Sequence, residues 1–241
     1  MLEPMPEPIL AADGIVRTYT GANGVLAVRG ASLSLKPKDF VALMGPSGSG
    51  KTTFIGVLSG LDRPDQGEVR WKGAPMASLS AEERRALRRT AMGIVFQSFG
   101  LLPTLSAVEN AELPLRFGGT PLDEARTRAA AWLARLGLGD RLENRTFELS
   151  AGQQQRVAVA RALIAEPEVV LADEPIAEVD TENADLILEA LWDVIRRGGA
   201  VLAVTHNPEV LRYANRVVLF RDGQVDAEGS PDELAPRLTT D

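Results

Sequence analysis

Short apolar runs separated by polar turn residues occupy the first part of the chain. Residues 14–20 (GIVRTYT), 25–35 (VLAVRGASLSL) and 39–45 (DFVALMG) are rich in Val, Leu and aromatic residues, and Gly, Asn, Pro and Asp lie between them. Such runs between turn residues are typical of strands. The N-terminal part of the chain is therefore predicted to be β-rich.

Helical signals dominate the middle of the chain. Helix starts are marked by Ser80 with Glu83, by Ser106 with Glu109, and by Thr120-Pro121. A Ser followed three residues later by Glu forms a reciprocal capping box, and Pro suits the first turn of a helix. The third helix should run to about Leu136. We expect a helical insertion between roughly residues 98 and 163.

Buried strands return after this insertion. Residues 168–173 (EVVLAD) and 200–206 (AVLAVTH) are short, continuous apolar runs flanked by helical patterns. This pattern is typical of parallel strands that are covered on both faces. Residues 216–229 then predict a hairpin that turns at Asp222-Gly223, and Ser230 with Glu233 predicts a last short helix. The order indicates an α/β nucleotide-binding core with a helical insertion.

The composition of the chain argues against several classes of function. A length of 241 residues suits one large domain or a domain with an inserted subdomain, and a net charge of −7 gives no general attraction to nucleic acid or anionic lipid. The absence of cysteine excludes disulfides and thiolate chemistry. We expect no export signal in residues 1–14, which carry acids and prolines, and no apolar run reaches the ~20 residues that span a bilayer.

The most specific motif is GPSGSGKT, from Gly45 to Thr52. It follows the strand-like FVALM and precedes a helix-like run, which is the context of a phosphate-binding P-loop. Its glycines let backbone N–H groups face phosphate oxygens. Lys51 would reach the β- and γ-phosphates, and the Thr52 hydroxyl could ligate Mg²⁺.

A second motif ends a buried strand in two acids. Asp173 and Glu174 close VVLADE, and burial of two carboxyl groups is costly unless a cation lies at the strand end. We expect Asp173 to hold Mg²⁺ through water and Glu174 to deprotonate the attacking water. His206, the one histidine, ends the next apolar strand. A lone histidine is more often structural, but this position favours contact with the γ-phosphate.

The P-loop, ELSAGQQQR, ADEP and VTH occur in an order that resembles the ATP-binding cassette (ABC) family of transporter ATPases over nearly the whole chain. The resemblance implies one nucleotide-binding domain over residues 1–241. It would be a P-loop NTPase core with a RecA-like parallel sheet, an antiparallel β subdomain and an inserted helical subdomain. Tyr19 would stack on the adenine of ATP. The remaining ATP-binding residues would be Gly45, Pro46, Ser47, Gly48, Ser49, Gly50, Lys51, Thr52 and Thr53.

The stretch ELSAGQQQR has a separate role in this family. The resemblance implies that Ser150, Ala151, Gly152 and Gln153 close the ATP held by a second subunit, so that two ATP molecules lie between two chains. The expected assembly is a homodimer or a pseudo-symmetric heterodimer. Gln97, in VFQS, would contact Mg²⁺ and the attacking water and act with Glu174 and His206 in hydrolysis.

Within the family, the chain is similar to the macrolide-exporter and lipoprotein-release group. The stretches that carry this similarity include RTYTG, GLDRPDQGEV and IVFQSFGLLPTLSAVENAELPL. This resemblance implies an integral membrane partner subunit and a position on the cytoplasmic face of the inner or plasma membrane. Phe99, Leu101, Leu102 and Pro103 lie where the family receives a coupling helix from the membrane subunit. The alternative for these four residues is ordinary core of the helical insertion.

Two departures from the family pattern concern the second-subunit site. Ala151 replaces a usual Gly, which is tolerable if that residue is helical but costs ~1 kcal/mol or more if its φ is positive. Glu178 stands in DEPIAEVD where Ala is typical, and it adds negative charge near the dimer seam. Because of these two substitutions, the family resemblance does not predict the rate of ATP hydrolysis.

Two other functions remain as alternatives. A DNA-maintenance ATPase could use RRALRR, residues 84–89, as a phosphate-binding patch, although a solvated helix face is the simpler interpretation and no sustained heptads occur. A regulatory module could bind nucleotide without turnover, which Glu174 and His206 argue against. We expect no nucleic-acid partner.

Overall fold

Two β-sheets form the body of the molecule, and the computed structural model describes residues 7–20 and 24–238. Residues 1–6, part of the stretch in which no export signal is expected, lie outside the described range. The smaller sheet is antiparallel in the order β2-β1-β4-β5. Its strands are β1 (Leu10–Tyr19), β2 (Val25–Leu35), β4 (Gln66–Trp71) and β5 (Ala74–Pro75).

The larger sheet has the order β10-β9-β3-β8-β7-β6, and all its pairings are parallel except that of β10 with β9. Its strands are β3 (Phe40–Met44), β6 (Met92–Val95), β7 (Val169–Asp173), β8 (Ala200–Val204), β9 (Arg216–Arg221) and β10 (Gln224–Gly229). The parallel strands end at one edge of the sheet, where α/β folds place their ligands.

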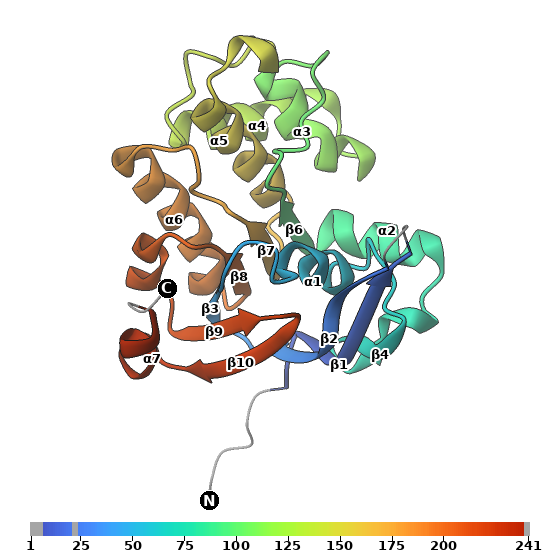
Figure 1. Ribbon diagram of the computed structural model, residues 1–241. Helices are drawn as coiled ribbons and strands as arrows, with labels where there is room; N and C mark the ends of the chain where they lie inside the picture. Colours follow the sequence, from blue (N-terminus) through green and yellow to red (C-terminus); the bar gives the residue numbers. More distant parts are fainter. Residues whose placement is uncertain (1–6, 21–23, 239–241) are drawn as a thin grey trace, which may run out of the picture.

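Seven α-helices complete the described part of the chain. They are α1 (Lys51–Leu58), α2 (Ala81–Thr90), α3 (Ala107–Phe117), α4 (Leu122–Arg135), α5 (Ala151–Leu163), α6 (Thr181–Arg196) and α7 (Pro231–Leu238). Helices α3, α4 and α5 gather at the top of Figure 1, at the end of the molecule away from both chain termini.

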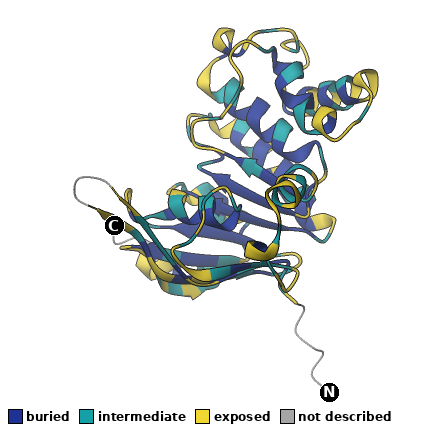
Figure 2. Cartoon of the chain, turned by 90° about the vertical axis from the view of Figure 1, so that its right-hand side faces the viewer, coloured by how far each residue is buried: buried dark blue, intermediate teal, exposed yellow. Residues whose placement is uncertain are grey.

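The parallel sheet is buried on both faces, as its dark blue strands in Figure 2 show. In β3, Phe40, Ala42 and Met44 pack in the cluster that contains α5 and α6. Val41 and Leu43 pack in the other cluster, with α1 and the antiparallel sheet. Successive strand residues face opposite sides, so a strand covered on both sides must be apolar throughout. This requirement explains the continuous apolar runs.

The predicted α/β class is confirmed. The capping boxes at Ser80, Ser106 and Ser230 form as expected, and the hairpin turns at Asp222 and Gly223, both at positive φ. Helices dominate the middle of the chain as predicted, but the sequence analysis did not predict the strands β4, β5 and β6, which also lie there. Strand β6 is only four residues long, and Val69 is the one buried residue of β4, so neither gives a strong apolar signal.

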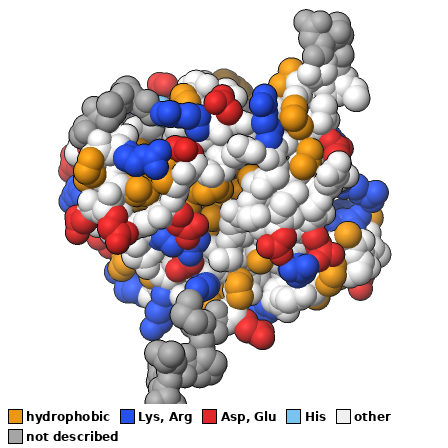
Figure 3. Space-filling view, turned by 60° about the horizontal axis from the view of Figure 1, so that its bottom comes forward, with side chains coloured by type: hydrophobic (Ala, Val, Ile, Leu, Met, Phe, Trp, Pro, Cys, Tyr) orange, Lys and Arg blue, Asp and Glu red, His pale blue; other side chains and the backbone are white. Residues whose placement is uncertain are grey.

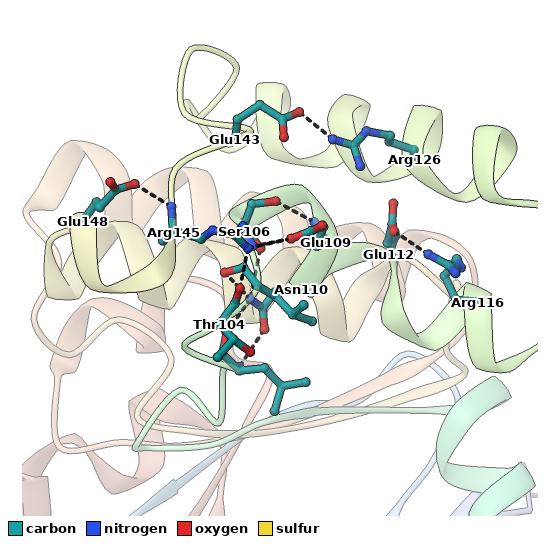
Figure 4. Close-up of polar contacts among 12 residues, drawn as sticks. Thr104, Ser106, Glu109, Asn110, Glu112, Arg116, Arg126, Glu143, Arg145 and Glu148 are labelled. Atoms are coloured by element: carbon teal, nitrogen blue, oxygen red, sulfur yellow. Dashed lines mark hydrogen bonds and ion pairs between the residues drawn. The ribbon is translucent and has the colours of Figure 1, made fainter.

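A buried amide fixes the loop that enters the helical region (Figure 4). Asn110, fully buried in α3, donates from Nδ2 to the carbonyls of Leu102, Leu105 and Ser106 at 3.0–3.3 Å. Its Oδ1 accepts from the Leu102 N–H at 2.8 Å. Nearby, the Arg145 guanidinium contacts Glu109 at 3.2 Å and also bonds the Thr104 carbonyl. These contacts hold the loop against the start of α3.

Neither a membrane-spanning helix in the described residues nor one dominant charge on the face in Figure 3 is present. Over residues 7–20 and 24–238, no helix has the length and apolar character needed to cross a bilayer. On the face in Figure 3, acidic and basic side chains are interspersed with apolar ones.

We predict that Asn110→Ala lowers the free energy of unfolding by about 2–4 kcal/mol, because it leaves several buried backbone groups without a partner. Urea unfolding would measure the change. Glu143→Ala is the matched control: it removes only an exposed 2.6 Å ion pair to Arg126, so it should cost less than about 1 kcal/mol. Equal losses in the two variants would contradict the role given to Asn110.

Candidate functional site

The loop after β3 is pressed closely between two neighbouring strands. Gly45 and Gly50 have φ angles of 153° and 102°. A Cβ atom at Gly45 would lie 1.9 Å from the Phe220 carbonyl oxygen, and one at Gly50 would lie 2.1 Å from that of Ala27. Any side chain would therefore displace β9 or β2. The loop is held where its backbone faces the open edge of the sheet.

Lys51 opens α1 and folds back over this loop. Its Nζ donates to the carbonyls of Gly45 at 2.7 Å and Pro46 at 2.8 Å, and to Ser49 Oγ at 3.3 Å. Burial lowers the pKa of Lys51, while the nearby carboxylates of Glu174 and Asp173 oppose that shift. The helix N-terminus and the ammonium group thus concentrate positive charge at one place.

Asp173 ends β7 directly opposite α1. The Thr52 hydroxyl donates to Asp173 Oδ2 at 2.6 Å, and the residue is only 4% exposed. Burial raises the pKa of Asp173, the charge of Glu174 raises it further, and the bond from Thr52 and the charge of Lys51 oppose the rise. Keeping Asp173 ionised therefore costs folding free energy, and a bound cation would reduce that cost.

Glu174 is held by groups from the next strand, β8, and the residues after it. The Thr205 hydroxyl donates to its Oε2 at 3.1 Å, and His206 Nδ1 lies 2.8 Å from its Oε1. The His206 side chain is 77% exposed, and that of Glu174 is 13% exposed. The histidine therefore reaches solvent while it contacts a mostly buried carboxylate.

Most of the predicted nucleotide-site residues line one open depression of about 610 Å³. They are Tyr19, Ser47, Gly48, Ser49, Gly50, Lys51, Thr52, Thr53, Gln97, Asp173 and Glu174. Tyr19 lies at its rim, 44% exposed, with its hydroxyl bonded to Asp62 at 2.8 Å and the Arg17 guanidinium 4.8 Å from its ring centre. Residues that are far apart in the sequence and were predicted to share a nucleotide site therefore lie together in the fold.

The other predicted residues do not line this depression. Gly45, Pro46 and His206 line a neighbouring cavity, although His206 contacts Glu174, which lines the depression. Ser150, Ala151 and Gly152 line a third cavity, which shares no lining residue with the nucleotide depression. Gln153 caps the start of α5. Within the described residues, the Ser150 group and the P-loop are thus two separate surfaces.

Helix α5 begins at Ser150 with a capping box. Ser150 Oγ accepts from the Gln153 N–H at 3.3 Å, and Gln153 Oε1 accepts from the Ser150 N–H at 2.9 Å. Ala151 is the first helical residue and has no positive φ, so the strain considered for it does not arise. Glu178, at φ 61°, lines the same cavity as Ser150.

The segment from Phe99 to Pro103 has features of both alternatives, which are contact with a membrane subunit and ordinary core of the helical insertion. Leu101 packs against the main core, as ordinary core residues do. Leu102 is 47% exposed although Asn110 fixes its backbone. The Phe99 carbonyl accepts from Arg161 at 2.8 Å. Pro103 is exposed as well, so two apolar residues of this loop face outward.

The arginines of residues 84–89 are largely engaged within the chain. Arg84 donates to the Leu79 and Met76 carbonyls, Arg88 to the Gly60 carbonyl at 3.0 Å, and Arg85 pairs with Glu82 at 2.8 Å. These contacts fit a helix face that supports the neighbouring loops.

Sequence reasoning missed several residues of these sites. Thr205 bonds Glu174, and Arg29, Asp222 and Gly223 line the nucleotide depression. Thr205 could have been found, because it directly precedes His206. Arg29 could not, because only the packing of β2 beside the P-loop brings it there.

The geometry fits a magnesium nucleotide. The backbone and Lys51 present positive charge to phosphate oxygens, and Thr52 with Asp173 offers the oxygen ligands that Mg²⁺ prefers. A model of the ABC transporter family matches residues 28–177. The chain belongs to the ABC transporter family. It is a nucleotide-binding domain of that family, and its membership supports ATP hydrolysis as its activity.

Curated relatives include exporters. The chain is 44% identical over 235 residues to a macrolide export ATP-binding/permease protein, MacB, of Syntrophobacter fumaroxidans, covering 96% of this chain and 33% of that protein. It is 41% identical over 234 residues to a pyoverdine export ATP-binding/permease protein, PvdT, of Pseudomonas entomophila, covering 96% and 36%. The chain thus spans about a third of the length of these relatives.

A solved structure supports the same assignment. The ATP-binding cassette MJ0796, in a dimeric post-hydrolysis state bound to ADP and Pi, superposes with a TM-score of 0.86 at 37% sequence identity. The match covers 92% of this chain and 98% of that one. The predicted ABC family and its P-loop ATPase fold are confirmed.

We predict that Asp173→Asn raises the melting temperature when nucleotide and metal are absent. The folded-state pKa of Asp173 is raised, so ionisation at neutral pH costs folded-state stability that the neutral amide avoids. The gain should be complete above the raised pKa and should disappear as pH falls to about 4, the ordinary Asp value. Calorimetry across this pH range would measure it.

Asp65→Asn is the control for this prediction. The pKa of Asp65 is lowered, mainly by the Thr18 N–H, so its ionised form stabilises the fold and the substitution should lower the melting temperature at neutral pH. A loss of stability in both variants at neutral pH would show that burial of Asp173 imposes no cost.

Proposed function

We propose that this chain is the ATP-hydrolysing subunit of an ABC exporter, that two copies close around two ATP molecules, and that hydrolysis drives a membrane subunit. One observation carries the proposal. The P-loop, Asp173 and Glu174 meet in one depression, whereas Ser150 lies at a separate cavity. This separation supports the proposal, in which the two surfaces are complementary halves of a site and a partner copy supplies the second half.

Each residue of the depression has a distinct task in this proposal. Lys51 and the P-loop N–H groups bind the phosphates. Glu174 accepts a proton from the attacking water, and its bonds from Thr205 and its contact with His206 orient the carboxylate. Tyr19 stacks on adenine, and Gln97 contacts the water. Mg²⁺, held through Thr52 and Asp173, would neutralise charge that develops on the phosphate oxygens.

The second copy completes the site from the other side. Ser150 and the N–H groups of Ala151 and Gly152 lie at a helix N-terminus, which favours anions. The proposal places this N-terminus on the γ-phosphate held by the partner. The solved relative MJ0796 is a dimer, which supports such an assembly. The pair would be a homodimer or a pseudo-symmetric heterodimer.

The proposed membrane partner follows from the relatives. MacB and PvdT are named as ATP-binding/permease proteins. We place this chain on the cytoplasmic face of the membrane, beside an integral subunit of macrolide-export or lipoprotein-release type. Leu102 is the contact that we assign to this partner, because it is exposed on a loop whose backbone is fixed by Asn110.

Glu174→Gln should slow ATP hydrolysis ~10²-fold or more and leave ATP binding intact, because only the proton acceptor is lost. ATP-bound dimers should accumulate, as measured by light scattering. Adding Ser150→Arg to this variant should abolish the dimer but not ATP binding by the single chain. An unchanged kcat in Glu174→Gln would remove this residue from the mechanism, and dimers that persist with Ser150→Arg would remove the second-copy role.

Leu102→Glu should prevent co-purification with a membrane-spanning protein from detergent extracts of native membranes, while the ATPase activity of the isolated chain stays within about twofold. A buried charge disfavours an apolar contact. Leu122→Glu is the matched control, because Leu122 is 46% exposed on α4 in the same helical region. If both variants retain the membrane protein, or if both lose it, Leu102 is not the contact.

A further inference from the structure

A buried glutamine in α5 contacts the backbone that carries Glu174. Gln155 is only 1% exposed. Its side-chain Nε2 donates to the Pro175 carbonyl at 2.9 Å and approaches the Glu174 carbonyl at 3.4 Å. A buried amide that donates to backbone carbonyls fixes the position of that backbone, since breaking the contact leaves polar groups unsatisfied.

The backbone at Glu174 needs such support. Its φ is 52°, in the left-handed region that costs a residue with a Cβ roughly 1–2 kcal/mol. Such a conformation persists only where the surroundings determine it from several sides. From β8, the Val204 carbonyl accepts the Glu174 N–H at 2.8 Å. From α5, Gln155 contacts the carbonyls of Glu174 and Pro175.

The same helix carries Ser150 at its start. Gln155 lies in the second turn of α5, five residues after Ser150. The loop after Glu174 also runs along the first turn, because a Cβ atom at Gly152 would lie 2.9 Å from the Glu178 carbonyl oxygen. The loop that carries Glu174 and the helix start that carries Ser150 are therefore packed as one unit within the chain.

We propose that Gln155 is a positioning residue: it fixes the backbone at Glu174 and so ties the direction of that carboxylate to helix α5. This rests on the proposed function of Glu174 as proton acceptor. Because α5 begins with Ser150, the helix that receives the partner's nucleotide also sets the orientation of this chain's own Glu174. Each ATP site thereby depends on the other through one side chain.

Gln155→Met tests the proposal, because Met keeps the length of the side chain but cannot donate. We expect kcat for ATP hydrolysis to fall about tenfold to a hundredfold, as small displacements of a reacting group do, with KM for ATP within about threefold. Gln154→Met is the matched control. Its amide donates to the Leu149 carbonyl at 3.0 Å and not toward Glu174, so kcat should stay within about twofold.

A double-mutant cycle separates positioning from general damage. Because Gln155 acts through Glu174, adding Gln155→Met to Glu174→Gln should not lower the residual rate of phosphate release further. A further loss equal to that seen in the otherwise unchanged protein would overturn the proposal, and so would a kcat for Gln155→Met equal to that of Gln154→Met. If Glu174→Gln itself leaves kcat unchanged, the proposed function of Glu174 fails, independently of Gln155.

Melting temperature and binding of a fluorescent ATP analogue establish that each variant is folded. Should Gln155→Met not fold, Gln155→Asn is measured in the same cycle, because it keeps the amide and withdraws the donor by one methylene. Its kcat should also fall at least tenfold with little change in KM. Full activity of a folded Gln155→Asn would overturn the proposal.

Discussion

Two carboxyl groups at the end of a fully buried strand impose the constraint on which the site depends. Strand β7 is apolar on both faces, so Asp173 and Glu174 emerge from a core that cannot solvate them. The fold compensates from its neighbours: Thr52 of α1 bonds Asp173, while Thr205 and His206, after β8, contact Glu174. The parallel order of the sheet brings these elements to one edge.

The glycines of the P-loop allow the loop to pass close to neighbouring strands at the same edge of the sheet. The loop crosses between β9 and β2 so closely that only hydrogen fits at Gly45 and Gly50. This tight passage directs the loop backbone and Lys51 toward the two acids. Helix α5 instead starts at another cavity, with Glu178 and Asp180 beside it. In the proposed function, the first surface binds a nucleotide and the second covers the nucleotide of a partner copy.

Much of this arrangement could be predicted from the sequence, because the signals are local. The P-loop, the two apolar strands and the capping boxes each depend on residues a few positions apart. Strands β4 and β6 were missed because β4 has a single buried residue and β6 is four residues long. Arg29 and Gln155 were missed because their roles come from packing between distant segments. In GQQQR nothing distinguishes Gln155 from Gln154 until the helix turns one of them inward.

The two departures from the family pattern differ in their physical consequences. Ala151 lies within α5 and needs no positive φ, so its methyl group is compatible with the helix start. Glu178 adopts a φ of 61°, and the close approach of its carbonyl to Gly152 holds its backbone against α5. Glu178 lines the cavity of Ser150 and not the depression that contains Asp173. The added charge therefore acts on the surface that would cover a partner's phosphate, where it opposes the positive N-terminus of α5.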